Sequence, residues 1–193
     1  MHNLEQQVQQ QFEEQIALVR RVQEMAPDIT RVAKVITHAV RQGNKVLTMG
    51  NGGSASDAMH MAGELIGRFM LERPSYPAIA LCADNAAMTA IANDYGYEQV
   101  FSRQVEGLCR AGDIVFGIST SGNSLNVLLA MEEARRQGGT TISLSGRDGG
   151  KLAPLTDYSL VVPSLQTPRI QEMHITIIHI LCQLVETALQ NSD

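Results

Sequence analysis

The chain has 193 residues, enough for one domain with a sizeable core, and 44% of its residues are apolar while 18% are charged. Its net charge of −5 comes without a basic block, which argues against nucleic-acid binding through phosphate neutralisation. No stretch approaches the roughly 20 apolar residues that span a bilayer, and the Gln- and Glu-rich segment Met1–Gln15 lacks the apolar core of a signal peptide. Cys82, Cys109 and Cys182 form no Cys-x-x-Cys pair, so we expect free or buried thiols, as in a cytoplasmic protein. From the charge and the lack of a long apolar run, we expect neither a nucleic-acid nor a membrane partner.

Two amphipathic helices, together covering about residues 3–42, are expected at the N-terminal end. Apolar residues recur every three or four positions over roughly residues 3–25. A second helix starts at Pro27 and is ended by Gly43 and Asn44. The narrow apolar stripe of the first helix suits packing against another subunit as well as packing on the chain's own core, so the sequence leaves both interpretations open.

From Lys45 onwards, short apolar runs alternate with longer periodic segments, which is typical of a parallel sheet with helices on both faces. The expected strands are Lys45–Met49, Ala78–Ala83, Asp113–Ile118, Thr140–Leu144 and Tyr158–Val162. The expected helices are Ser54–Met70, Ala86–Ala92, Gln99–Cys109, Leu125–Arg136 and a long one from about Arg169 to Leu189. No linker or internal repeat interrupts the pattern, so we expect residues 1–193 to form a single α/β domain with a doubly wound, five-stranded parallel sheet.

Two polar loops are expected at one rim of this sheet. Gly50–Ser54 and Ser119–Ser124 each follow a strand and precede a helix, so both lie at carboxyl ends of strands, where such sheets bind ligands. The glycine-rich loop lacks the spacing of a dinucleotide fingerprint and the lysine of a Walker loop, which leaves a ligand-binding turn or a simple tight turn.

The second loop, Ser119–Ser124, has four hydroxyl side chains and no Lys or Arg. The free N–H groups in the first turn of the following helix favour an anion, so we interpret the loop as a phosphate site and not only as a helix cap. Asn93 and Asp94, in the polar cluster that follows the Ala86–Ala92 helix, either hold sugar hydroxyls or cap the next helix.

Two helices carry candidate metal-ligand or acid–base residues. His60 and Glu64 are four positions apart and project from one helix face, which fits a metal-ligand pair, an acid–base pair or a surface hydrogen bond. The last helix carries Gln171, His174 and His179 among apolar residues. Gln171 and His174 share a face, whereas Gln171 and His179 lie about 80° apart around the axis. Periodicity alone therefore does not choose between the two histidines.

Taken together, these motifs resemble the sedoheptulose 7-phosphate isomerase (phosphoheptose isomerase) family of the sugar-isomerase, or SIS, fold group. The resemblance covers essentially the whole length and rests on separated motifs in the right order: Gly50–Ser54, Asp57–His60 with Glu64, Asn93–Asp94, Ser119–Ser124, and Arg169–Glu172 with His179. It implies the SIS fold with a five-stranded parallel sheet and a homotetramer with active sites between subunits. It also implies conversion of sedoheptulose 7-phosphate to D-glycero-D-manno-heptose 7-phosphate, the first step in making heptose for bacterial surface polysaccharides such as lipopolysaccharide.

By motif position, the resemblance implies one zinc ion per subunit, bound by His60, Glu64, Gln171 and His179, and so selects His179 over His174. This donor set suits zinc without excluding manganese or iron. The implied substrate contacts are Asn51, Gly52, Gly53, Glu64, Asn93, Asp94, Ser119, Thr120, Ser121, Ser124 and Gln171. In an enediol route, Glu64 is the expected general base and His179 the expected general acid.

A related group on the same fold, the bacterial DnaA-initiator-associating proteins, regulates replication without this activity. In that group the positions that match Glu64 and His179 hold residues that cannot perform the chemistry, so the presence of both here favours the enzyme. A non-catalytic regulator or sugar-phosphate sensor, and an isomerase of another phosphosugar, are the alternatives. The chain departs from some isomerases at Pro168, where they have an aspartate, so we assign no carboxylate role there.

Overall fold

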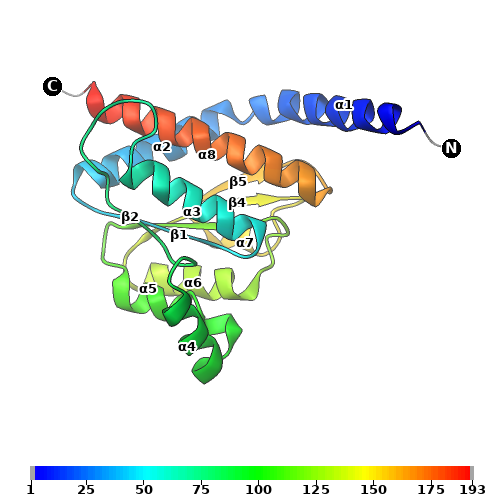
Figure 1. The fold of residues 1–193 in the computed structure, drawn as a ribbon. Helices are drawn as coiled ribbons and strands as arrows, with labels where there is room; N and C mark the ends of the chain where they lie inside the picture. The colour runs from blue at the N-terminus through cyan, green and yellow to red at the C-terminus, as the bar shows by residue number, and fades with distance from the viewer. Residues whose placement is uncertain (1–2, 192–193) are drawn as a thin grey trace.

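The computed structural model describes residues 3–191 and shows one parallel sheet with helices on both faces (Figure 1). Within that range five strands lie in the order β2-β1-β3-β4-β5, and all neighbouring strands are parallel. The strands are β1 (Val46–Gly50), β2 (Ala78–Ala80), β3 (Ile114–Ser119), β4 (Thr140–Gly146) and β5 (Tyr158–Val162). The predicted α/β class and five-stranded parallel sheet are confirmed. The predicted domain ends, residues 1 and 193, lie outside the described residues.

The helices account for most of the remaining chain. They are α1 (Leu4–Gln23), α2 (Ala26–Arg41), α3 (Gly53–Ile66), α4 (Asn85–Tyr95), the 3₁₀ turn η1 (Tyr97–Gln99), α5 (Ser102–Leu108), α6 (Leu125–Arg136), α7 (Leu152–Leu155) and α8 (Thr167–Gln190). Among residues 3–191, none of these helices combines the length and the apolar character that a membrane crossing needs. The cysteines Cys82, Cys109 and Cys182 are free thiols, as predicted.

Alternation of side chains along the strands builds a core on each face of the sheet. Val46 of β1 joins the core formed with α2, α3 and α8. Its neighbours Leu47 and Met49 join the core formed with α5 and α6 on the opposite face. Because both faces of the strands are buried, their sequences are nearly continuous apolar runs. Helices α2, α3 and α8 therefore cover one face of the sheet, and α5 and α6 cover the other.

Two helices end at positions that differ from the prediction. The predicted end of α3 at Met70 is wrong, because the helix stops at Ile66 and Gly67 follows with its N–H bonded to the carbonyl of Gly63. The predicted end of α4 at Ala92 is also wrong, because the helix continues to Tyr95. It stops at Gly96, whose φ of 92° is a conformation that favours glycine.

Three further differences lie between β2 and β5. The predicted strand over Ala78–Ala83 is too long, because the Ala83 N–H bonds back to Ala80 in a turn after three strand residues. The predicted helix from Gln99 begins at Ser102, since η1 occupies the preceding residues. The short helix α7 was not predicted, because a four-residue helix is too short to show a periodic pattern.

The two N-terminal helices pack differently. Helix α2 buries Ile29, Val32 and Ile36 in the core. Helix α1 extends past the sheet as an arm, and its described residues bury only Leu18 and Val22 (Figure 1). The rest of its apolar stripe is exposed in the single chain: Leu4, Val8, Phe12, Ile16 and Val19.

His174 joins α8 to the sheet. Its side chain is fully buried, and its Nε2 lies 3.1 Å from the carbonyl oxygen of Ser145 on β4. Burial lowers the pKa of the imidazole from 6.5 to about 4, although the hydrogen bond to Ser145 opposes the shift. The folded protein therefore holds this histidine neutral at physiological pH.

This buried histidine predicts a loss of stability in acid. The unfolded chain takes up a proton near pH 6.5 and the folded chain only near pH 4, so the free energy of unfolding falls as the pH drops through that window. The contribution of this one group is about 3 kcal/mol. Urea unfolding near neutral pH and near pH 4 should therefore show a smaller acid loss for His174→Gln than for the natural chain. An equal loss in both proteins would contradict the assignment.

Candidate active site

The two polar loops lie side by side at the rim of the sheet. Strands β1 and β3 are the neighbours at which the strand order reverses, and in their register Gly50 is the partner of Ile118. In doubly wound sheets this switch point is where ligands bind. Helices α3 and α6 start immediately after the two loops on opposite faces, so both helix N-termini favour an anion at this rim.

The hydroxyl-rich loop closes on itself at its ends. The Oγ atoms of Ser119 and Ser124 are 2.9 Å apart, and the Asn123 N–H donates to Ser121 Oγ over 3.2 Å. In the described structure Ser124 makes no side-chain bond to the N–H groups of α6, so a simple helix cap does not account for it. Gly122 has a φ of 65°, and a Cβ there would overlap the carbonyl oxygen of Gly149. The loop therefore needs glycine at this position.

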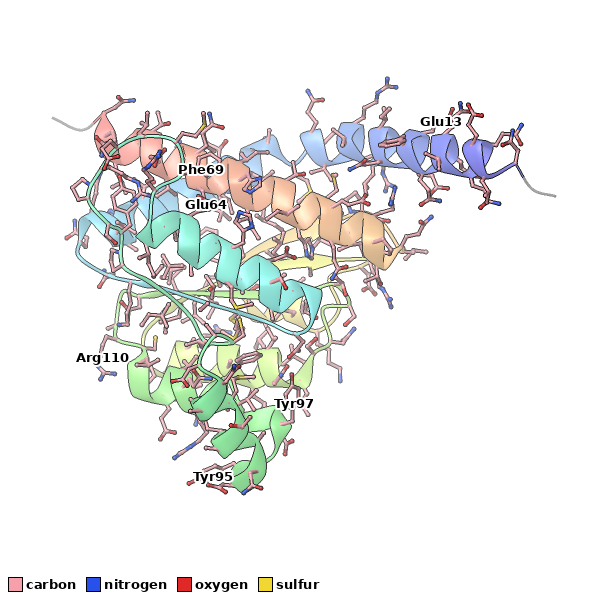
Figure 2. The ribbon with its side chains drawn as sticks, viewed as in Figure 1. Glu13, Glu64, Phe69, Tyr95, Tyr97 and Arg110 are labelled. Carbon is pink, nitrogen blue, oxygen red and sulfur yellow. The ribbon has the colours of Figure 1, made fainter. Side chains whose placement is uncertain are left out.

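Asn51 ties the two loops together. Its side-chain amide and that of Asn126 each donate to the other over 2.9 Å. The hydroxyl of Tyr97, a residue labelled in Figure 2, also donates to the Asn51 side chain over 2.9 Å. Asn126 and Tyr97 were not predicted as site residues. The signal for Asn126 was a single polar residue among the apolar residues that begin α6, Leu125, Val127 and Leu128.

Asn93 and Asp94 lie exposed in the last turn of α4, where the Asn93 amide donates to Asp94 over 2.7 Å. Tyr97 follows a few residues later and connects this segment to Asn51 at the rim. The predicted substrate contacts of Asn93 and Asp94 stay predictions.

Three candidate ligands meet where α3 and α8 pack against each other. His60 Nε2 lies 3.0 Å from Glu64 Oε1 and 3.2 Å from His179 Nε2. One ligand atom from each of the three lies within 4.8 Å of the others. The side chains of His60 and Glu64 are 43% and 25% exposed, so a ligand can reach them from solvent. Of the two histidines on α8, His179 lies at this cluster and His174 faces the sheet.

This cluster fits a divalent cation. Tetrahedral zinc with bond lengths of about 2.0–2.1 Å holds its ligand atoms about 3.3 Å apart. The separations from His60 Nε2 to Glu64 Oε1 and to His179 Nε2, 3.0 and 3.2 Å, are close to that value, and the three ligand atoms all lie within 4.8 Å of one another. Two imidazole nitrogens and one carboxylate oxygen match the three protein ligands of catalytic zinc sites, which leave another position open.

Gln171 lies at the glycine-rich loop. It precedes His179 by eight residues, which is about 12 Å along α8. Its side-chain amide packs on Gly53, at the position that a Cβ would occupy. Its position at the glycine-rich loop suits the predicted contact of Gln171 with substrate. The role of Gln171 as a metal ligand stays a prediction.

Asp57 is an additional candidate that entered the sequence analysis only as part of a motif. It lies one turn before His60 on α3 and is half-buried, and its Oδ2 has no hydrogen-bond partner among the described residues. Burial raises the pKa of this carboxyl to about 6, and attraction to His60 partly offsets the shift. A carboxyl that titrates near neutral pH beside the cluster can take part in proton transfer.

The comparisons with known proteins agree on one family. The family model for the SIS domain matches residues 10–146. The phosphoheptose isomerase of Pelobacter propionicus is 57% identical over 166 residues, which cover 86% of this chain and 88% of that protein. The phosphoheptose isomerase of Trichlorobacter lovleyi is 51% identical and covers 94% of this chain and 93% of that protein.

Two solved structures share the fold along nearly the whole chain. The phosphoheptose isomerase of Neisseria gonorrhoeae superposes with a TM-score of 0.91 at 41% identity, over 96% of this chain and 100% of that chain. The phosphoheptose isomerase of Francisella tularensis gives a TM-score of 0.93 at 38% identity, over 96% of this chain and 99% of that chain.

The ligand cluster predicts one divalent-cation site per chain. Isothermal titration of chelator-treated protein with Zn²⁺ should show that site, and His60→Ala or His179→Ala should weaken it by more than about tenfold, because even changes around a metal ligand typically cost 10–100-fold. His38→Ala, on the exposed side of α2, is the matched control and should bind like the natural chain. Unchanged affinity in both ligand variants would exclude this site.

Proposed function

Because the chain belongs to the phosphoheptose isomerase family of SIS-domain proteins, we propose that it converts sedoheptulose 7-phosphate to D-glycero-D-manno-heptose 7-phosphate. The observation that carries this proposal is the meeting of Glu64 and His179 with His60, from helices that are far apart in the sequence. Gly53 at the rim precedes His60 by seven residues, a rise of about 10 Å along α3. An extended seven-carbon sugar with a terminal phosphate has about that length.

The reaction moves a proton between two adjacent carbons while their oxygens exchange carbonyl and hydroxyl character. An enediol route needs a base for the carbon-bound proton and an acid for the oxygens. Glu64 is the base in this proposal, and His179 is the acid that serves the carbonyl oxygen and ring opening. The ring of His179 packs edge-on against the ring of His60, with 4.9 Å between ring centres, and at a tilt against the ring of Phe69, with 5.7 Å between ring centres. These contacts orient the His179 ring.

His60, Glu64 and His179 are the proposed zinc ligands, with Gln171 as the fourth. A bound divalent cation supplies Lewis-acid polarisation of the substrate's carbonyl and hydroxyl oxygens. Glu64 is proposed for both roles, and a carboxylate that holds a cation is a weaker base than a free one. His60, hydrogen-bonded to Glu64 over 3.0 Å, orients that carboxylate.

The phosphate is proposed to bind at the hydroxyl-rich loop, through Ser119, Thr120, Ser121 and Ser124. Its donors are hydroxyl and backbone N–H groups without a Lys or Arg in the loop, which suits an anion that must also leave. Asn51, Gly52, Gly53, Asn93, Asp94 and Gln171 are the further proposed substrate contacts. Binding the unreactive phosphate positions the reacting carbons beside Glu64 and contributes to the rate through orientation.

We further propose a homotetramer with active sites at subunit interfaces. The uncovered apolar stripe on α1, in which Phe12 is 60% exposed, supports association of copies. The free thiols of Cys109 and Cys182 support a cytoplasmic location. The product fits heptose biosynthesis for bacterial surface polysaccharides.

The role of Glu64 predicts the outcome of one substitution. Glu64→Gln should lower kcat by about 10²–10⁴-fold, because it removes the proton acceptor. The variant should stay folded, because this side chain is 25% exposed and can be solvated. A coupled assay with sedoheptulose 7-phosphate and zinc measures turnover, and circular dichroism measures folding.

Glu72→Gln is the matched control, since Glu72 is 93% exposed in the loop after α3 and should leave turnover unchanged. Full activity of Glu64→Gln would rule out Glu64 as the base. A natural chain that shows no turnover with zinc supplied would instead refute the isomerase and favour a non-catalytic regulator.

A further inference from the structure

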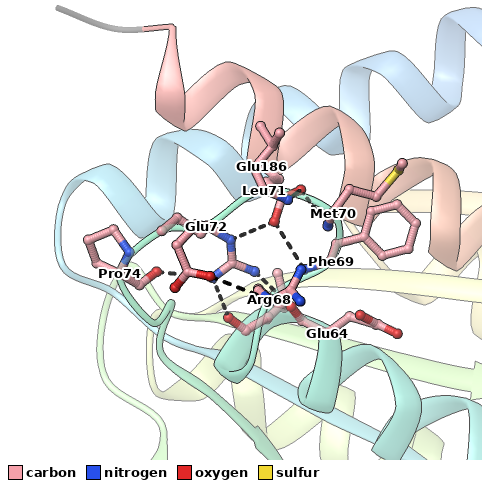
Figure 3. Close-up of polar contacts among 10 residues, drawn as sticks. Glu64, Arg68, Phe69, Met70, Leu71, Glu72, Pro74 and Glu186 are labelled. Carbon is pink, nitrogen blue, oxygen red and sulfur yellow. Dashed lines mark hydrogen bonds and ion pairs between the residues drawn. The ribbon is translucent and has the colours of Figure 1, made fainter.

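The loop that follows α3 is tied to α8 by a single buried carboxylate. Glu186, whose side chain is 2% exposed, accepts the backbone N–H groups of Phe69, Met70 and Leu71 over 3.0, 2.8 and 2.9 Å (Figure 3). It also accepts Nε of Arg73 over 2.8 Å. Four donors fill the acceptor sites of one ionised carboxylate. The course of this loop is therefore fixed by a residue more than a hundred positions away.

Arg73 carries the connection onward to α3. Its side chain is 1% exposed, and its guanidinium donates to the carbonyl oxygens of Glu64 over 2.7 Å and of Leu65 over 3.0 Å. These carbonyls belong to the last turn of α3, whose final carbonyl groups have no partner within the helix. Arg73 also lies over the ring of Tyr76, 3.9 Å from its centre. The guanidinium thus caps α3 at the residue that is the proposed base.

Glu186 also lies on nearly the same face of α8 as the proposed acid, His179. Glu186 follows His179 by seven residues, so the two side chains leave nearly the same face of α8, two turns apart. The loop that Glu186 orders lays the Phe69 ring on His179 at 5.7 Å. Glu64 is therefore fixed through its backbone, and His179 through the ring of Phe69.

The pair is ionised. Burial alone would raise the pKa of the Glu186 carboxyl, but the N–H groups of Met70, Leu71 and Phe69 together with Arg73 lower it below its ordinary value. A buried ion pair is retained at low cost only when its hydrogen bonds are satisfied. The two side chains here bond to each other and to six backbone groups: the carbonyls of Glu64 and Leu65, and in the loop the N–H groups of Phe69, Met70 and Leu71 and the carbonyl of Pro74.

We propose that Arg73 and Glu186 are positioning residues of the active site. Their ion pair holds α3 and α8 at the spacing at which His60 and Glu64 meet His179, and the loop that they order holds Phe69 against the acid. This inference rests on the proposed function, because the residues that the pair positions are the proposed base, acid and metal ligands.

The chain offers a matched control at the opposite rim of the sheet. Asp113 is a buried carboxylate that accepts the backbone N–H groups of Lys45 over 3.0 Å and of Arg110 over 2.8 Å, and it pairs with the Lys45 ammonium. It immediately precedes β3 and so lies at the amino ends of the strands, away from the two polar loops. Asp113→Asn thus removes a comparable carboxylate without touching the α3–α8 contact.

The test compares Glu186→Gln with Asp113→Asn at a temperature at which circular dichroism shows both to be folded. Zn²⁺ affinity of the chelator-treated protein is measured by titration, and kcat and KM are measured separately with sedoheptulose 7-phosphate. Glu186→Gln should lose about tenfold or more in Zn²⁺ affinity and in kcat with little change in KM, a cost typical of residues that support a metal site. Asp113→Asn should keep both values near those of the natural chain while its melting temperature falls.

The proposal would be overturned if Glu186→Gln kept the Zn²⁺ affinity and the kcat of the natural chain. It would also be overturned if Asp113→Asn lost as much Zn²⁺ affinity and kcat as Glu186→Gln does. Should Glu186→Gln not fold, Arg73→Lys and Phe69→Ala replace it. The first variant keeps the charge but loses the branched donor group, and the second removes the ring that packs on His179. Loss of Zn²⁺ affinity or kcat in these variants supports the proposal, and wild-type values in both overturn it.

The two readouts separate this inference from the proposed function. A natural chain that binds Zn²⁺ without turnover refutes the isomerase, while Zn²⁺ affinity still tests the pair. A natural chain that turns over without binding Zn²⁺ refutes the metal site, while kcat still tests the pair. A natural chain that does neither removes the site that the pair is proposed to position and overturns both.

Discussion

The packing of α3 against α8 is the constraint on which the candidate site depends. Both helices bury one face in the same core, with Met61 and Leu65 from α3 and Ile178 from α8. Their exposed edges then bring His60 and His179 to 3.2 Å across 119 positions of sequence. Because catalytic geometry tolerates errors of well under 1 Å, apolar packing alone does not define it, and polar contacts at the edges of the interface become decisive.

The sheet supplies the other half of the arrangement. Its strand order reverses between β1 and β3, so the glycine-rich loop and the hydroxyl-rich loop emerge as neighbours with a helix N-terminus behind each. Since α3 begins at the glycine-rich loop and carries His60 two turns further on, one helix links the proposed substrate contacts Gly52 and Gly53 to the proposed metal ligands. The proposed phosphate loop lies beside the start of this helix, at the neighbouring strand β3.

Local patterns predict the parts of this protein that local physics determines. The strands are apolar runs because both sheet faces are buried, and the two loops are visible as glycines and hydroxyls between a strand and a helix. The contact between His60 and His179 is not visible in this way, because helical periodicity does not say whether His174 or His179 faces α3. The helical pattern of the sequence also continues past Gly67, so it does not indicate the loop at Phe69, whose N–H is bonded to Glu186 117 positions away. Hydrogen bonds between one carboxylate and residues far away in the sequence produce no periodic sequence pattern. Such bonds complete the candidate site.

Zinc-edge anomalous diffraction from crystals grown with Zn²⁺ tests the central claim most directly, because it locates the cation without reference to activity. The account predicts one strong peak per chain within bonding distance of His60 Nε2, His179 Nε2 and a Glu64 carboxylate oxygen, about 2.0–2.2 Å from each. A peak that avoids these atoms, or His60 and His179 bound to separate ions, would contradict the claim that α3 and α8 together form the catalytic centre.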